Sequence, residues 1–220
     1  MNMLRRGSKK GGSSRGGGAS RDEAVDALFA SYADAAAEGS EPAIGPEGVE
    51  RLCADLGVEP TDWRVLALAW KMGAARMGFF TQAEFRHGCH SLGADSCEKL
   101  RKALPLLEQE LGAYPAAHRD FHCFAFRYCC TEPRQKTLDL ETASTMLRLL
   151  HEGKPHVAEF CEFVTEGQAE YSRLTLDQWE GFLRFSEEVG EDCAGYDESQ
   201  AWPLLMDNFV EWLQAKRGDA

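Results

Sequence analysis

Residues 73–84, with the sequence GAARMGFFTQAE, carry the pattern that decides the fold. The segment has the length of the twelve-residue loop of an EF-hand, a helix–loop–helix unit that binds calcium. Gly78 stands where that loop turns sharply, Phe80 at the apolar position that pairs with a partner loop, and Glu84 at the final acid. The segment therefore predicts two helices joined by a structured loop.

The same segment lacks the ligands of a calcium site. Gly73, Ala75 and Met77 stand where side-chain oxygens are needed, and none of them has one. Because calcium takes six to eight oxygen ligands, we expect the geometry without the ion. A calcium sensor, and a plain helical hairpin in which the Gly and the Glu occur by chance, are the alternatives.

Other apolar residues occupy comparable loop positions. Ile44, between two predicted helices, is expected to pair with Phe80. Leu138 and Leu174 hold similar places in the second half of the chain, which predicts a second pair of loops.

Outward from this loop, apolar residues recur at helical spacing. No long segment alternates between apolar and polar residues, as a β-strand would, so we predict an all-α fold. Three capping boxes mark helix starts: Ser20 with Glu23, Thr81 with Glu84, and Thr175 with Gln178. Further helices are expected from Pro46 to Gly57, from Pro60, from Asp95 to about Leu111, from Pro115 to Cys130, and over about 139–152, 155–167, 175–189 and 202–214.

The domain organisation follows from composition. Residues 1–19 are mostly Gly, Ser, Lys and Arg, so they bury too little apolar surface to order and should be disordered. Residues 20–214 form the predicted helical domain, with lobe one over about 20–131 and lobe two over about 137–214. Residues 215–220 are a short tail.

Charge narrows the class of partner. The 220 residues carry a net charge of −12, and residues 1–21 contain six basic residues and no acid. The remainder has 18 basic and 36 acidic residues, a net charge of −18, which favours a basic protein partner over nucleic acid. No apolar run is long enough to predict a membrane span.

Chemical motifs do not assemble into a catalytic site. The eight cysteines mostly fall among apolar residues of predicted helices, which indicates free thiols in a reducing compartment. A thiol enzyme using Cys129 or Cys130 is an alternative, since Arg127 lies nearby in sequence. His118 and His122 have helical i, i+4 spacing, but a zinc site needs further ligands. We therefore predict a binding protein without metal or cofactor.

Residues 195–212, GYDESQAWPLLMDNFVEW, are similar to the end of the potentiating-neddylation (PONY) domain of Dcn-like, "defective in cullin neddylation", proteins. The resemblance extends over about residues 22–213. Its other motifs are residues 66–71 (LALAWK), 80–85 (FTQAEF), 95–100 (DSCEKL), 135–141 (QKTLDLE) and 176–179 (LDQW). It implies an all-α domain of two lobes built from degenerate EF-hand-like units.

The resemblance also implies a function. Such proteins are accessory, scaffold-type ligases without an active site of their own. They hold the C-terminal winged-helix region of a cullin and the acetylated N-terminus of the neddylation-conjugating enzyme, while a RING-box protein is the main ligase. A monomer working in the nucleus and cytoplasm is implied. An EF-hand-like adaptor that works without calcium is the alternative.

Two surfaces are implied by the same resemblance. The cullin-binding residues match Asp177, Ala201 and Asp207, and the stretch 187–214 holds eight acids and no Lys or Arg. Carboxylates facing cullin Lys or Arg would give orientation and fast encounter. Without the resemblance, Asp177 would suit a helix N-terminal turn and Asp207 a solvated helix face.

The second surface is an apolar pocket for the acetylated methionine, because acetylation removes an ammonium charge that is costly to bury. Its matching residues are Val49, Val65, Leu66, Leu68, Ala69, Phe80, Tyr128 and Leu149. Pro46, Met77, Gly78 and Met146 depart from the residues of relatives and would reshape the pocket.

Overall fold

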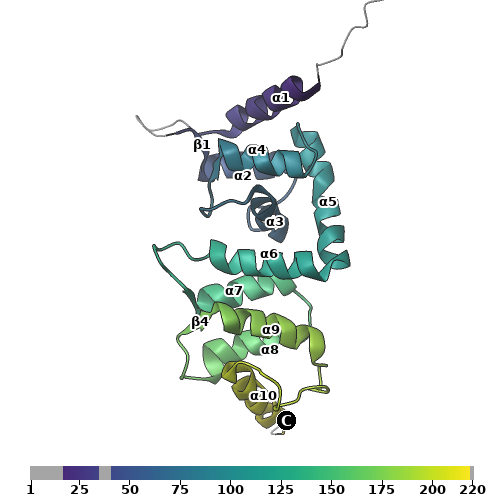
Figure 1. Ribbon diagram of the computed structural model, residues 1–220. Coiled ribbons are helices and arrows are strands. Elements are labelled where there is room, and N and C mark those ends of the chain that lie inside the picture. Colours follow the sequence, from purple (N-terminus) through teal and green to yellow (C-terminus); the bar gives the residue numbers. More distant parts are fainter. Residues whose placement is uncertain (1–16, 35–40, 219–220) are drawn as a thin grey trace, which may run out of the picture.

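The computed structural model describes residues 17–34 and 41–218. Its helices confirm the all-α prediction, and Figure 1 shows their arrangement. The helices are α1 (Gly17–Tyr32), α2 (Pro46–Leu56), α3 (Trp63–Met72), α4 (Gln82–Ser91), α5 (Cys97–Ala113), α6 (Pro115–Tyr128), α7 (Leu140–His151), α8 (Val157–Glu162) with the π-helical turn η1 (Phe163–Gly167), α9 (Leu176–Glu188) and α10 (Leu204–Gly218). The short strands are β1 (Ala43–Ile44), β2 (Phe80–Thr81), β3 (Thr137–Asp139) and β4 (Arg173–Thr175).

Local hydrogen bonds explain where several helices begin. Thr81 and Glu84 form the predicted capping box of α4, and Thr175 and Gln178 form that of α9. In each, the threonine hydroxyl accepts from a backbone N–H that the first turn leaves free, and the longer side chain accepts from the threonine N–H. These helix starts are therefore encoded within four residues.

Other predicted ends were wrong. Helix α1 begins at Gly17, so Ser20 lies inside it and residues 17–19 are helical; the rest of the predicted disordered tail lies outside the described residues. Helix α3 begins at Trp63, not near Pro60, because the Asp62 carboxylate accepts from the Arg64 N–H at 2.8 Å and caps it. Helix α10 runs through Gly218 and includes most of the predicted C-terminal tail.

Two antiparallel strand pairs join the helix–loop–helix units. Ile44 lies opposite Phe80 in β1–β2, and Leu138 lies opposite Leu174 in β3–β4. Both predicted pairings are thus present, and all four side chains are buried. Each pair fixes two loops that are far apart in sequence, which sets the spacing of the helices they connect.

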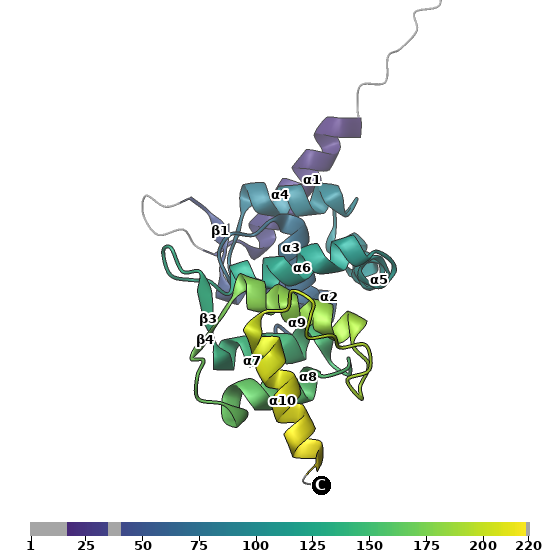
Figure 2. The same ribbon diagram turned by 60° about the horizontal axis from the view of Figure 1, so that its bottom comes forward.

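Helix α6 lies between two hydrophobic cores, across the middle of Figure 1. Phe121 and Tyr128 on α6 pack into the core built by α1–α5, while Phe126 and Cys129 pack into the core of α7–α10. Figure 2 brings α10 to the front, beside α9. Because α6 contributes to both cores, a single helix holds the two halves of the chain together.

Among the described residues, no helix is both long enough and apolar enough to cross a membrane.

Candidate functional site

A cavity of about 600 Å³ opens between α2, α3 and α7. Seven of the eight predicted pocket residues line it: Val49, Val65, Leu66, Ala69, Phe80, Tyr128 and Leu149. They come from α2, α3, β2, α6 and α7, so the cavity depends on the packing of distant segments. Its walls are mainly apolar side chains, which suits a buried apolar ligand.

Leu68 is the exception. It does not line the cavity but packs into the first core with 2% of its surface exposed. On a helix, successive residues turn by about 100°, so Val65, Leu66 and Ala69 share a direction from which Leu68 points away. Leu68 therefore lies outside the cavity that the other seven residues line.

Nine further residues line the cavity. Pro46, Met77, Gly78 and Met146, which were expected to reshape the pocket, are four of them. Glu50, Pro60, Thr61, Asp62 and Thr145 line it as well and were not predicted. Asp62 comes directly before α3, three residues from Val65, and this nearness in sequence was the available signal.

The loop of residues 73–84 forms one wall of this cavity, and its polar groups are engaged within the protein. The Glu84 carboxylate accepts from the backbone N–H groups of Ala75 and Thr81, both at 2.8 Å. The oxygens that would face a calcium ion thus close the loop instead. Among the described residues, no group of three or more His, Cys, Asp or Glu could hold a metal.

Tyr128 fixes the same loop from the other side. Its hydroxyl accepts from the Gly78 N–H and donates to the Arg76 carbonyl, both at 3.2 Å. Burial raises the Tyr128 pKa to about 12, so the hydroxyl stays protonated and can donate. Gly78 has φ 76°, a left-handed conformation that favours glycine, and it holds the loop against α6.

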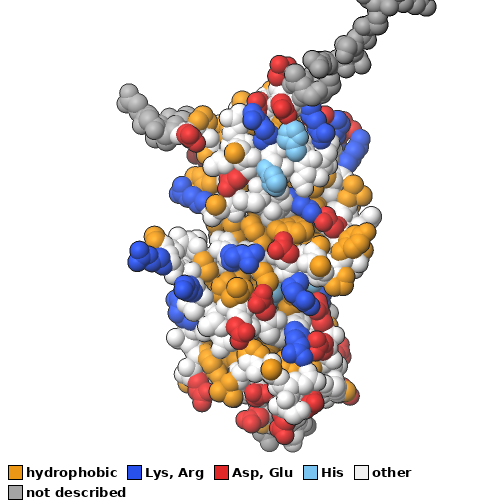
Figure 3. Space-filling model, in the orientation of Figure 1, with side chains coloured by type: hydrophobic (Ala, Val, Ile, Leu, Met, Phe, Trp, Pro, Cys, Tyr) orange, Lys and Arg blue, Asp and Glu red, His pale blue; other side chains and the backbone are white. Residues whose placement is uncertain are grey.

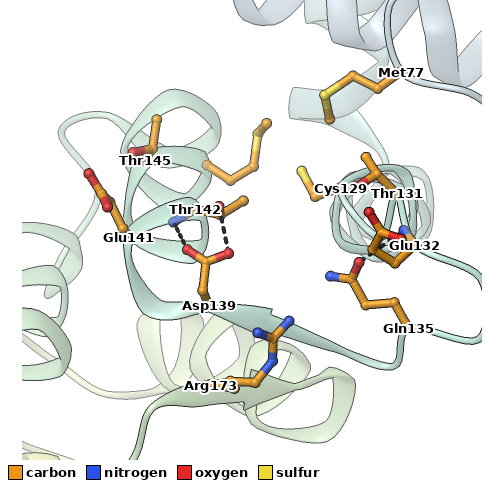
Figure 4. A pocket seen from close by; sticks show the side chains of 11 residues that line it. Met77, Cys129, Thr131, Glu132, Gln135, Asp139, Glu141, Thr142, Thr145 and Arg173 are labelled. Carbon is orange, nitrogen blue, oxygen red and sulfur yellow. Dashed lines mark hydrogen bonds between the residues drawn. The ribbon is translucent and has the colours of Figure 1, made fainter.

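A second cavity, of about 620 Å³, continues from the first and shares Met77, Thr145 and Met146 with it. Figure 4 shows that Thr142 and Thr145 line one side, and Cys129, Thr131 and Glu132 the other. Its remaining lining residues include Gln135, Asp139, Glu141 and Arg173. The two cavities therefore form one groove, apolar at the α2–α3 end and polar at the β3–β4 end.

The second predicted surface lies on α9, α10 and the loop between them. Asp177 is exposed in the first turn of α9, Ala201 is exposed in the loop before α10, and Asp207 is half-buried in the first turn of α10. Tyr196 donates a hydrogen bond to Asp207 and so orients it. Burial, followed by this hydrogen bond, raises the pKa of Tyr196 and keeps its hydroxyl protonated.

Contacts along one face of α9 bring these segments together. A Cβ added at Gly181 would lie 2.6 Å from the Pro203 ring, so the loop packs directly on the helix one turn after Asp177. Two turns after Asp177, Arg184 stacks on the Trp202 ring and donates to Gln200 at 2.7 Å. The loop holding Ala201 is therefore fixed on the face of α9 that bears Asp177.

The histidines and cysteines that the sequence offered as a metal ligand or a reactive thiol pack and form hydrogen bonds within the protein. The His122 ring stacks on Trp179 and bonds its carbonyl at 2.9 Å, and His151 bonds His122 at 2.9 Å. Cys123 takes no part in these histidine hydrogen bonds and donates to the Glu180 carboxylate instead. Burial raises the pKa of Cys129 to about 12 and raises that of Cys130, so neither is a thiolate near neutral pH.

The buried histidine pair should make stability fall with acid. Burial lowers the pKa of His122 to about 3 and that of His151 to about 2. In the unfolded chain the pKa of a histidine is near 6.5, so as the pH falls below that value only the unfolded chain takes up these protons. The stabilisation is therefore present above pH 6.5 and lost below it. From pH 7 to 5.5 the pair should lower the free energy of unfolding by roughly 2.5 kcal/mol, measured by urea titration.

A variant with an exposed histidine replaced, His87→Gln, should keep this dependence. An equal free energy of unfolding at the two pH values would contradict the assignment of neutral, buried histidines.

The amino-acid sequence of this chain is similar to those of known proteins. The chain matches the family described as cullin binding over residues 99–212. It is 39% identical over 174 residues to DCN1-like protein 2 of Dictyostelium discoideum (79% of this chain, 64% of that protein). It is 38% identical over 181 residues to DCN1-like protein 5 of Homo sapiens (81% and 74%), and 42% over 178 residues to DCN1-like protein 4 of Danio rerio (80% and 62%). The chain thus spans from 62% to 74% of the length of these relatives.

Proposed function

Since the chain belongs to the cullin-binding family of DCN1-like proteins, we propose that it is an accessory ligase of cullin neddylation. It binds the C-terminal winged-helix region of a cullin at Asp177, Ala201 and Asp207. It also binds the acetylated N-terminus of the neddylation-conjugating enzyme in the cavity between α2, α3 and α7. The observation that carries the proposal is that one chain has an acidic surface on α9 and α10 and an apolar cavity between α2, α3 and α7, with no residue in common.

The gain in rate comes from positioning. Holding two reactants in productive geometry can lower a barrier by about 7–11 kcal/mol in favourable cases, with no side-chain chemistry from the scaffold. The thioester cysteine belongs to the conjugating enzyme, and the RING-box protein takes part without binding this chain directly. We place a monomer in the nucleus and cytoplasm, as the family resemblance implies.

The acidic surface suits a basic partner. Asp177 forms no ion pair within the described residues, and Asp207 is oriented by Tyr196. A partner Lys or Arg can therefore approach the two carboxylates without first displacing a cation of this chain. Ala201, between them in the loop, leaves room for close approach.

The apolar cavity suits a capped N-terminus. Its walls include Val65, Ala69 and Phe80, and the carboxylate of Asp62 at its mouth is already paired with Arg64. The Arg64 guanidinium and the α3 N-terminus hold the pKa of Asp62 below its usual value. Of the two acids that line the cavity, Asp62 is thus already paired and Glu50 is exposed on α2, whereas an acetyl group and a methionine side chain match the apolar walls.

The two partners should bind at the same time. The cavity lies mainly on α2, α3 and α7, and the acidic surface on α9 and α10, so we expect the affinity for one partner to change by less than about twofold when the other is saturating. Calorimetry of a cullin C-terminal fragment, with and without acetylated conjugating-enzyme peptide, measures this. Mutual displacement would show that the partners share one surface and would refute a bridging role.

A further inference from the structure

A third cavity, of about 710 Å³, lies between the end of α6, the loop from α6 to β3, and the start of α9. Phe126, Cys130 and Leu176 contribute apolar surface to it. Three cations, Arg127, Arg134 and Lys136, line it together with Glu132 and Asp177. We call this the basic groove. Figure 3 shows Lys and Arg side chains gathered at the left edge of the molecule, over the connection between α6 and β3.

The three cations of the basic groove are available to a partner. Arg127, Arg134 and Lys136 are exposed, and none forms an ion pair within the part of the chain that the structure describes. Other basic residues, such as Lys71 and Arg86, are paired with acids of this chain. In a protein of net charge −12, this cavity stands out because three cations outnumber the two acids that line it.

The loop that presents two of these cations is braced. The Gln135 N–H donates to the Glu132 carbonyl, and the Gln135 side chain accepts from the Glu132 N–H, both at 3.1 Å. The same side chain donates to the Thr137 carbonyl at 2.8 Å. Arg134 has φ 65°, a left-handed conformation that glycine adopts at lower cost. The turn thus holds a long cation where a glycine would be easier to place.

We propose that the basic groove binds an acidic segment of the cullin that docks on Asp177. Asp177 itself lines the groove, so a partner with a basic residue at Asp177 places its neighbouring residues over the cations. The apolar floor favours a polypeptide over a phosphate ion, and the acids Glu132 and Asp177 disfavour a nucleic-acid backbone. The inference rests on the proposed function and sharpens it. A cullin surface fits only if it places a basic residue at Asp177 and acidic residues at the cations of the basic groove.

The test compares two double variants with the same change of charge. Arg134→Glu with Lys136→Glu reverses the groove; Arg101→Glu with Arg119→Glu reverses two exposed cations on α5 and α6 that do not line it. We expect the groove variant to bind a cullin C-terminal fragment at least about tenfold more weakly. The control should bind as tightly as wild type or more tightly, because added negative charge attracts a basic partner.

A single variant separates binding from folding. Arg134→Gly removes one cation and relieves the left-handed backbone, so its Tm should be equal to or above that of wild type. Its affinity for the cullin fragment should still fall several-fold. An unchanged affinity in this folded variant, or a groove variant that binds like the control, would overturn the proposal.

The outcomes also separate this inference from the proposed function. If the groove variant binds as wild type does while replacement of Asp177 and Asp207 abolishes binding, the groove proposal fails and the proposed function stands. If wild-type protein does not bind the cullin fragment, both fail.

Discussion

Replacing Asp177 with Ala and Asp207 with Asn should weaken binding of the cullin C-terminal region by at least about 100-fold. Each carboxylate is proposed to face a partner cation, and removing one member of a buried, hydrogen-bonded charge pair costs about 2–5 kcal/mol. Asn is chosen at 207 because its amide oxygen can still accept from Tyr196 and so keeps the loop before α10 in place. Calorimetry with a cullin fragment measures the loss.

A matched control is available for this prediction. Glu152→Gln with Glu166→Gln removes two exposed acids of the second half of the chain that lie outside the acidic stretch 187–214, and it changes the net charge equally. It should retain affinity within about threefold at 0.15 M salt, where distant surface charges are largely screened. Equal losses in the two double variants would show that net charge, and not these two positions, governs binding.

The second large effect concerns the acetyl group. A conjugating-enzyme peptide with a free N-terminal amine should bind at least about 100-fold more weakly than the acetylated peptide, because burying an unpaired ammonium costs several kcal/mol. Of the two acids that line the cavity, Asp62 is paired with Arg64 and Glu50 is exposed to solvent, so neither is a buried partner for the ammonium group. Fluorescence anisotropy of labelled peptides measures both affinities.

A substitution at the cavity checks where the peptide binds. Val49→Arg places a long cation on the half-buried wall of the cavity and should abolish binding of the acetylated peptide while leaving the helical CD spectrum unchanged. Equal affinities for acetylated and free peptides would contradict the apolar-cavity account, as would normal binding by the folded Val49→Arg variant.

Local features of the fold could be predicted because neighbouring residues determine them. The capping boxes at Thr81 and Thr175 involve residues three apart, and the turn at Gly78 needs a positive φ. The start of α3 was misplaced because Pro60 and Asp62 both suit a helix start, and only the observed hydrogen bond to Arg64 decides between them.

The surfaces were harder to predict, because they depend on packing. Helix α3 is apolar nearly all round, so the sequence could not separate Leu68, which faces the core, from Leu66, which faces the cavity. The basic groove combines Arg127 with Arg134 and Lys136 from a different segment, and no motif marks it. Overall acidity concealed it further, since net charge says nothing of local arrangement.

Reconstituted cullin neddylation, with acetylated conjugating enzyme and a RING-box protein, tests the central claim most directly. Adding this protein at limiting enzyme should raise the initial rate at least about tenfold, in line with catalysis by positioning. Neither the Asp177→Ala, Asp207→Asn variant nor the Val49→Arg variant should do so. A rate unchanged by folded wild-type protein, or raised equally by both variants, would contradict the account.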